Sequence, residues 1–357
     1  MKILENINFS LLIPSILISS LGIFVLLSLS EGYARQQVAY TVLGILLFFT
    51  LSSIDYSMFF PFWKYIFIFM NFLLLLTLIA GKEVRGSLRW ITFGSFNFQP
   101  SEFAKIILVF LLSYFFSKIA KEKPKLSDFF KSLALFLPTF LLVFLQPDLG
   151  TSIIIVLVYL MVLASSKINK VYFLIGFIIF GIISGPVWNL MKDYQKERIF
   201  VFLDPYKDPL GAGYNVLQSQ IAVGSGLIFG KGFGHGTQSR LKFLPEYYTD
   251  FIFASFSEEW GFMGVILLFV LFGFLLWGIL KVMVFSKDRF SFFVCVGVFT
   301  IILFQMFINI GMNVGIMPVT GITLPLVSYG GSSMLSTFMG LGFVNAVWKR
   351  AKQYPHL

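Results

Sequence analysis

Residues Leu244 to Trp260 read LPEYYTDFIFASFSEEW, and within them a long polar segment gives way to a membrane-like apolar run. Asp250 lies at this boundary, and Glu258 and Glu259 follow inside the apolar part. A carboxylate at or below a water–lipid boundary is costly, so it is usually functional or paired. The position of Asp250 therefore makes it the first candidate for a catalytic residue.

The composition on both sides of this stretch is that of a polytopic membrane protein. Of 357 residues, 57% are hydrophobic and only 12% are charged, whereas a soluble domain carries about 25% charged residues. One cysteine, Cys295, and two histidines, His235 and His356, exclude a disulfide framework and a histidine cluster. The net charge of +10 is typical of cytoplasmic lysines beside anionic lipid, and we expect no nucleic-acid binding.

The apolar runs predict an all-α polytopic protein with about ten transmembrane helices, forming one integral membrane domain over residues 1–357. The predicted spans are 9–29, 37–53, 61–80, 101–119, 132–146, 150–165, 170–190, 251–280, 291–312 and 329–348.

Loop charges predict the orientation of these spans. If the N-terminus is inside, most lysines fall on the inner side, and the short outer loops carry only Arg35, Lys82, Arg85 and Arg89. Cytoplasmic loops of membrane proteins carry an excess of Lys and Arg. We therefore expect both termini in the cytoplasm and a large extracytoplasmic loop, about 191–250, between spans seven and eight.

The segment after the third span is rich in glycine, which interrupts a helix, and it is basic. Lys82, Arg85 and Arg89 lie here, the last beside Trp90. These cations either anchor the segment to lipid headgroups or bind an anionic substrate. Both interpretations place them at the outer membrane surface.

Two similar motifs begin predicted helices at the outer face. In Gln99-Pro100-Ser101-Glu102, Ser101 is a candidate helix cap and Glu102 lies in the first turn. Lys105 shares a helix face with Glu102, so the two are expected to pair toward the bundle interior or a polar cavity; the alternative is a purely structural ion pair. Gln146-Pro147-Asp148 repeats the pattern, and two such starts on one face predict a polar pocket.

Two further outer segments carry candidate residues. The long loop contains Arg198 and Lys231, and its residues 214–223 are compatible with a short amphipathic helix. Its GSGLIFGKG is not a phosphate-binding loop, because the spacing is wrong, no strand precedes it and no Ser or Thr follows Lys231.

Gly and Pro interrupt the apolar region of residues 311–333. Irregular backbone at this depth is either buried in protein or lines a cavity. Ser328 and the N–H groups of Gly330 and Gly331 are candidate contacts for a sugar or phosphate; a packed turn between helices is the alternative.

Together these features favour a membrane-bound anionic substrate, such as a lipid-linked pyrophosphoryl sugar. Its chemistry requires a base to deprotonate an acceptor hydroxyl and positive charge to stabilise the leaving pyrophosphate. Asp250 is the candidate base, and Lys105 and the arginines are the candidate partners of the leaving group.

Six motifs resemble a known family over nearly the whole chain: QPSEFAKI, QPDLGT, FLDPYKDPLGAGYNVLQSQIAVGSG, GKGFGHGTQS, FLPEYYTDFIFA and TGITLPLVSYGGSS. In this order they are similar to the SEDS proteins (shape, elongation, division and sporulation), which are polytopic peptidoglycan glycosyltransferases. DYQKERI and DPLGAGYN are more similar to the rod-shape-determining branch than to the division branch.

The resemblance implies that the chain lies in the bacterial plasma membrane and polymerises lipid II into β-1,4 glycan strands with inversion, releasing undecaprenyl pyrophosphate. It also implies a class B penicillin-binding protein and other elongation-complex proteins as partners. The essential family acid falls on Asp250, and a functional acid and lysine fall on Glu102 and Lys105. Three positions depart from the family pattern: Tyr248 replaces a common histidine, Thr323 a common proline, and Lys242 an acid frequent in division members.

Three alternatives stay open at this point. The chain fits a division-type glycosyltransferase, a lipid II flippase or a scaffold for its penicillin-binding partner. A flippase requires alternating access, and we see no paired broken helices in the two halves. No ligand cluster compels a metal site, although Mg²⁺ or Mn²⁺ is compatible with outer carboxylates such as Asp148.

Overall fold

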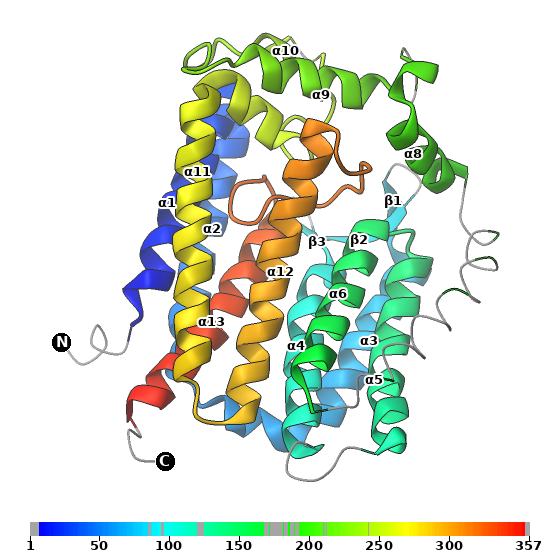
Figure 1. Cartoon of the computed structure of the whole chain (residues 1–357), viewed down its shortest axis with the longest axis vertical. Helices are drawn as coiled ribbons and strands as arrows, with labels where there is room; N and C mark the ends of the chain where they lie inside the picture. Colours follow the sequence, from blue (N-terminus) through cyan, green and yellow to red (C-terminus); the bar gives the residue numbers. More distant parts are fainter. Residues whose placement is uncertain are drawn as a thin grey trace.

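The computed structural model describes residues 7–84, 87–93, 96–119, 125–167, 171, 181, 185, 189, 193–209, 211, 213–241 and 243–353. The long helices form a bundle (Figure 1) and are α1 (Phe9–Leu29), α2 (Glu31–Ser53), α3 (Trp63–Ala80), α4 (Pro100–Ile119), α5 (Leu126–Leu145), α6 (Leu149–Ser165), α11 (Ile252–Phe285), α12 (Arg289–Val314) and α13 (Gly331–Gln353). A 3₁₀ helix, η2 (Tyr56–Phe62), leads into α3.

The predicted membrane fold is confirmed. Over the described residues, six helices are long and apolar enough to cross a membrane: Phe9–Leu29, Glu31–Ser53, Tyr56–Ala80, Leu126–Leu145, Ile252–Phe285 and Arg289–Val314. The predicted spans 101–119, 150–165 and 329–348 coincide with α4, α6 and α13. The predicted span 170–190 lies almost entirely outside the described residues.

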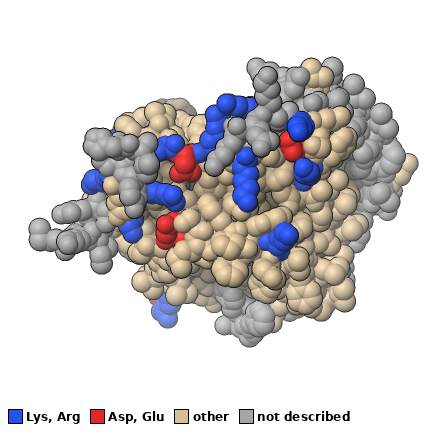
Figure 2. Space-filling view, turned by 90° about the horizontal axis from the view of Figure 1, so that it is seen from below, with Lys and Arg blue, Asp and Glu red and all other residues tan. Residues whose placement is uncertain are grey.

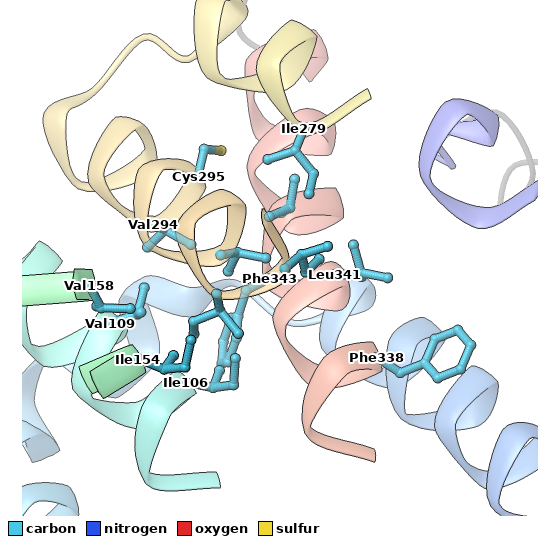
Figure 3. Packing of buried hydrophobic residues seen from close by; sticks show 14 of the residues in the cluster. Ile106, Val109, Ile154, Val158, Ile279, Val294, Cys295, Phe338, Leu341 and Phe343 are labelled. Atoms are coloured by element: carbon cyan, nitrogen blue, oxygen red, sulfur yellow. The ribbon is translucent and has the colours of Figure 1, made fainter. Parts of the chain in front are cut away.

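Helix α12 is at the centre of the bundle and packs against α4, α6, α11 and α13 (Figure 1). Of its most apolar window, 72% is buried inside the protein. Figure 3 shows the packing around it, in which Val109 of α4, Val158 of α6 and Val294 of α12 lie close together. A Cβ on Gly297 of α12 would lie 2.4 Å from Cγ1 of Val109, so glycine is required for this close helix approach.

A small antiparallel sheet follows α3, and the all-α prediction did not include it. It consists of β1 (Lys82–Val84), β2 (Ser87–Phe93) and β3 (Phe96–Phe98), in the order β1-β2-β3. Lys82 pairs with Trp90, and Ile91 pairs with Phe98. The β2 sequence SLRWITF is rich in the aromatic and β-branched residues that favour strands.

The long loop contributes four short elements: α8 (Asp193–Leu203), η3 (Pro205–Lys207), α9 (Tyr214–Ser225) and α10 (Thr237–Arg240). The predicted helix at 214–223 is confirmed as α9. These elements, the sheet and the connection 315–330 lie at one end of the bundle, which we call the loop end (Figure 1).

The opposite end carries both chain termini, and we call it the terminal end (Figure 1). The backbone N–H of Asn8 donates a hydrogen bond of 2.8 Å to Oδ1 of Asn345, so the start of α1 lies beside the end of α13. Seen from this end, Lys and Arg side chains predominate over acidic ones (Figure 2). Lys349 and Arg350 belong to this basic surface, and Arg350 lies 3.4 Å from the carboxylate of Asp55.

Candidate active site at the loop end

Asp250 is the last polar residue before α11, and two asparagines of α12 hold its backbone. The Asp250 carbonyl oxygen accepts hydrogen bonds from the side-chain amides of Asn309, at 3.0 Å, and Asn313, at 3.1 Å. Both asparagines are fully buried, whereas Asp250 itself is half-buried. The carboxylate of Asp250 therefore extends from a fixed backbone position at the edge of the core.

The surroundings of Gly321 bring Asp250 together with two of the predicted cations. A Cβ on Gly321 would lie 3.5 Å from Oδ2 of Asp250, 3.8 Å from Nη1 of Arg198 and 3.9 Å from Nη1 of Arg89. These three side chains come from the segment just before α11, from α8 and from β2. We call Asp250, Arg198 and Arg89 the Gly321 group. A carboxylate beside two guanidinium groups is suited to binding an anion next to a base.

Arg89 is fixed on one side by the turn before α6. Its Nη2 donates a hydrogen bond to the carbonyl of Pro147, and its Nη1 lies 3.7 Å from Oδ1 of Asp148. Nε of Arg89 has no hydrogen-bond partner among the described residues. The guanidinium group of Arg89 is thus held through its two terminal nitrogens, and its Nε–H is still able to donate a hydrogen bond.

Asp148 has structural partners on every side. It is 2% exposed and caps α6 by accepting from the backbone N–H of Thr151 at 3.1 Å. Burial raises the pKa of Asp148, but the Arg89 guanidinium and the Thr151 N–H outweigh this effect, so the pKa lies below its ordinary value. Asp148 was predicted as a substrate contact; its geometry instead favours holding Arg89.

The two Gln-Pro motifs lie side by side, and the polar pocket inferred from them stays a prediction. Nε2 of Gln99 and Oγ of Ser101 each lie 3.2 Å from Oδ2 of Asp148, which joins the start of α4 to the start of α6. The proposed cap at Ser101 is wrong, because α4 already begins at Pro100. Proline is favoured at the first position of a helix, where its missing N–H has no helical acceptor.

Glu102 and Lys105 form the predicted ion pair, at 2.9 Å between Oε1 and Nζ. The two residues are only 5% and 2% exposed, and Oε2 of Glu102 also accepts from Oγ of Ser336 in α13 at 3.1 Å. The pair therefore links α4 to α13 inside the bundle. In this structure the ammonium of Lys105 contacts Glu102 and is not exposed to solvent.

Ser328 and Gly330 were predicted to contact substrate, but their polar atoms make bonds within the protein. Oγ of Ser328 donates to the carbonyl of Thr249 at 2.7 Å, and the N–H of Gly330 donates to Oε1 of Gln37 at 3.3 Å. The first bond packs the 315–330 connection against the residue preceding Asp250, and the second joins it to α2. Gly331 is the first residue of α13.

Lys231 was grouped with the substrate-binding cations, and the structure places it in a different cluster. Its Nζ lies 2.6 Å from Oε1 of Glu258 and 2.9 Å from Oγ1 of Thr237. Glu258 is fully buried. Lys231 therefore neutralises a buried carboxylate and does not belong to the Gly321 group.

Two predicted cations cannot be placed: Arg85 and the side chain of Lys82 lie outside the described part of the chain. Across the part that is described, no three His, Cys, Asp or Glu side chains gather in a way that would hold a metal ion.

Comparison with known proteins agrees with the motifs. The family described as cell cycle protein, whose model covers FtsW, RodA and SpoVE, matches residues 4–353. The chain belongs to this family.

Similar proteins and solved structures agree with this family assignment. The chain is 36% identical over 322 residues to the peptidoglycan glycosyltransferase MrdB of Escherichia coli K12, covering 90% of this chain and 87% of that protein. A chain from a solved structure titled "Structural coordination of polymerization and crosslinking by a peptidoglycan synthase complex" is 31% identical, with a TM-score of 0.82 and coverage of 97% and 99%. The crystal structure of the rod shape determining protein RodA of Thermus thermophilus is 26% identical, with a TM-score of 0.72 and 98% coverage of both chains.

These findings confirm the predicted SEDS (FtsW/RodA/SpoVE) family and bear out the predicted enzyme class, since MrdB is named a peptidoglycan glycosyltransferase. The sequence reasoning missed Gly321, Asn309 and Asn313. A signal for the asparagines was present: they lie four residues apart in an apolar span and so share a helix face.

Proposed function

We propose that this SEDS protein is a peptidoglycan glycosyltransferase that polymerises lipid II into β-1,4 glycan strands and releases undecaprenyl pyrophosphate. The observation that carries the proposal is the Gly321 group, in which a half-buried carboxylate lies beside two guanidinium groups contributed by different segments. Glycosyl transfer from a pyrophosphate donor needs one base and stabilisation of the leaving phosphate charge.

In the proposed reaction, Asp250 accepts the proton of the acceptor sugar hydroxyl. The hydroxyl oxygen then attacks the anomeric carbon of the donor from the face opposite the pyrophosphate, and the bond between that carbon and the pyrophosphate oxygen breaks. Arg198 and Arg89 stabilise the negative charge that develops on the departing pyrophosphate. Glu102 and Lys105 support the site from within the bundle, because their ion pair fixes α4 against α13.

The decisive experiment is polymerisation of lipid II by purified protein carrying Asp250→Asn. This change keeps the size of the side chain and removes the base, so we expect turnover to fall about 10³-fold, within the range typical of a general base. Undiminished polymer would remove Asp250 from the mechanism. Headgroup translocation in liposomes without polymer from the unmodified protein would favour a flippase instead.

We further propose that the loop end is extracytoplasmic and that both termini are cytoplasmic. The predominance of Lys and Arg at the terminal end supports this orientation (Figure 2). Labelling of single cysteines placed at Lys349 and Lys207, in a Cys295→Ser background, tests it with a membrane-impermeant maleimide. Only the cysteine at position 207 should react in intact cells, and the opposite pattern would reverse the orientation.

A class B penicillin-binding protein and other elongation-complex proteins are the proposed partners. Support comes from the structural likeness to a chain of a complex that coordinates polymerization and crosslinking. The role in elongation rather than division is likewise a proposal. It is supported by the likeness to RodA, and it is tested by complementation of strains depleted of the elongation or the division glycosyltransferase.

A further inference from the structure

Two asparagines in the central helix contact the backbone carbonyl of the residue that carries the candidate base. Asn309 and Asn313 lie one helical turn apart in α12, and both are 0% exposed. Their amide nitrogens donate to the same oxygen, the Asp250 carbonyl, at 3.0 and 3.1 Å. A carbonyl oxygen has two lone pairs, so this pair of donors satisfies it completely.

The orientation of each amide follows from the chemistry of its neighbours. Oδ1 of Asn313 lies 3.1 Å from the backbone N–H of Ala254, which can only donate. The second amide hydrogen of Asn309 is directed at the carbonyl of Ile322, at 2.7 Å, which can only accept. Exchanging oxygen and nitrogen in either side chain would place like groups against each other. Each asparagine therefore has one favoured orientation.

The bonds made by this pair connect the segments that form the Gly321 group. Asn309 joins Asp250 to Ile322, the residue after Gly321, and Asn313 joins Asp250 to Ala254 in the first turn of α11. The pair thus fixes the distance between Asp250 and the point on which Arg198 and Arg89 converge.

Oδ1 of Asn309 is buried and has no hydrogen-bond partner among the described residues. A buried acceptor without a partner disfavours the folded state, and such groups are rare in native proteins. A network optimised for stability alone would not include it. This imperfect bonding points to a role for Asn309 beyond packing.

We infer that Asn309 and Asn313 are positioning residues that aim the Asp250 carboxylate by fixing its backbone. The inference rests on the proposed function, because it assigns them a task in the same reaction. A displacement of about 1 Å at a reacting group can cost on the order of 10²-fold in rate. Loss of either amide therefore lowers the rate of the chemical step more than the affinity for substrate.

The test uses Asn309→Leu and Asn313→Leu, since leucine has a similar branched shape and no hydrogen-bonding atoms. Asn345→Leu is the matched control, because Asn345 is also 0% exposed and bonded through its side chain but lies at the terminal end. The purified full-length proteins are compared in lipid II polymerisation and thermal unfolding. For the two α12 variants we expect kcat to fall roughly 10- to 100-fold, with KM within about twofold of the unmodified protein.

Three results would overturn the inference: an unchanged kcat, a loss confined to KM, or an equal loss of kcat in the Asn345→Leu control. Failure of the unmodified protein and the control to form polymer would instead reject the proposed function. If the leucine variants do not fold, Asn309→Ser and Asn313→Ser replace them. Serine retains a single donor, so kcat should still fall, and turnover equal to that of the unmodified protein would contradict the positioning role.

Discussion

Two carboxylates at the loop end, Asp250 and Glu258, lie close in sequence but in opposite kinds of environment. Glu258 is fully buried and receives hydrogen bonds from Nζ of Lys231 at 2.6 Å and from the backbone N–H groups of Thr237 at 2.8 Å and Gln238 at 3.2 Å. Asp250 is half-buried and adjoins the two guanidinium groups around Gly321.

We call Glu258 and its donors Lys231, Thr237 and Gln238 the Glu258 cluster. This cluster holds the loop of residues 227–241 onto a kink in α11. The N–H groups of Lys231 and Gly232 donate to the carbonyls of Glu258 and Glu259 at 2.9 and 3.0 Å. At the kink, Gly261 has φ +63°, and a Cβ there would lie 2.2 Å from the backbone nitrogen of Gly230. The Glu258 carboxylate therefore has a structural role, because its donors Lys231, Thr237 and Gln238 all belong to the loop that it holds.

Residue type alone does not separate a catalytic carboxylate from a structural one. Both acids lie near the start of the same apolar run, and both have cationic neighbours. The two carboxylates differ in solvent access. Burial with a complete set of protein donors favours a structural role, whereas partial exposure beside convergent cations favours a catalytic role.

The largest expected effect distinguishes the two arginines of the Gly321 group from Lys231, the cation paired with Glu258. In the double variant Arg198→Gln/Arg89→Gln, we expect turnover to fall about 10³-fold, because stabilisation of the leaving pyrophosphate is lost. Lys231→Gln should change turnover by less than about threefold once adjusted for folded protein. Steady-state polymerisation of lipid II measures both. Comparable losses in the two variants would place Lys231 in the site after all.

The next effect is on stability. Glu258→Ala leaves the ammonium of Lys231 and two backbone N–H groups without their acceptor, so we expect a loss of about 3 kcal/mol in the free energy of unfolding. The control is Glu31→Ala, whose ion pair with Arg35 is 70% exposed on the Glu31 side and contributes less than about 1 kcal/mol. Denaturant unfolding in detergent distinguishes them. A similar small loss in both would mean that the Glu258 cluster is not a structural clamp.

Gly321→Ala tests the space at the centre of the Gly321 group. Gly321 has φ +74°, which costs about 1 kcal/mol for a residue with a Cβ, and the added methyl would contact all three members of the Gly321 group. We expect roughly a 10-fold fall in turnover. Gly273→Ala is the control, since nothing lies within 4 Å of its Cβ position in α11. Full activity of the Gly321→Ala variant would show that the reaction does not need the space between Asp250, Arg198 and Arg89.

The smallest effect concerns pH. Because the pKa of Asp148 is below its ordinary value of 3.8 in the folded protein, its ionised form stabilises the fold above that value. This stability is lost as the pH falls through the lower folded pKa. Thermal unfolding measured from about pH 5 down to about pH 2 should therefore show a steeper decline below about pH 4 in the unmodified protein than in Asp148→Asn. Parallel curves would contradict the role of Asp148 as an ionised anchor for Arg89.

The prediction succeeded where a single segment carries the information. Each predicted span that the structure describes follows from a long apolar run, and the Glu102–Lys105 pair follows from helical spacing. It failed where partners come from distant segments. The sheet was missed because two of its strands have only three residues each. The ion pair of Lys231 was missed because its partner Glu258 lies 27 residues further along the chain.

The membrane class, the order of the helices, the family and the candidate base follow from the amino-acid sequence alone, because hydropathy and motifs are local properties of the chain. The tertiary structure establishes which charges lie next to one another. It separated Asp250 from Glu258 and gathered Arg198 from α8 and Arg89 from β2 around Gly321. It also brought two asparagines of α12 onto the Asp250 carbonyl. Burial and hydrogen-bond completeness depend on contacts between segments far apart in the chain, which no local pattern reveals.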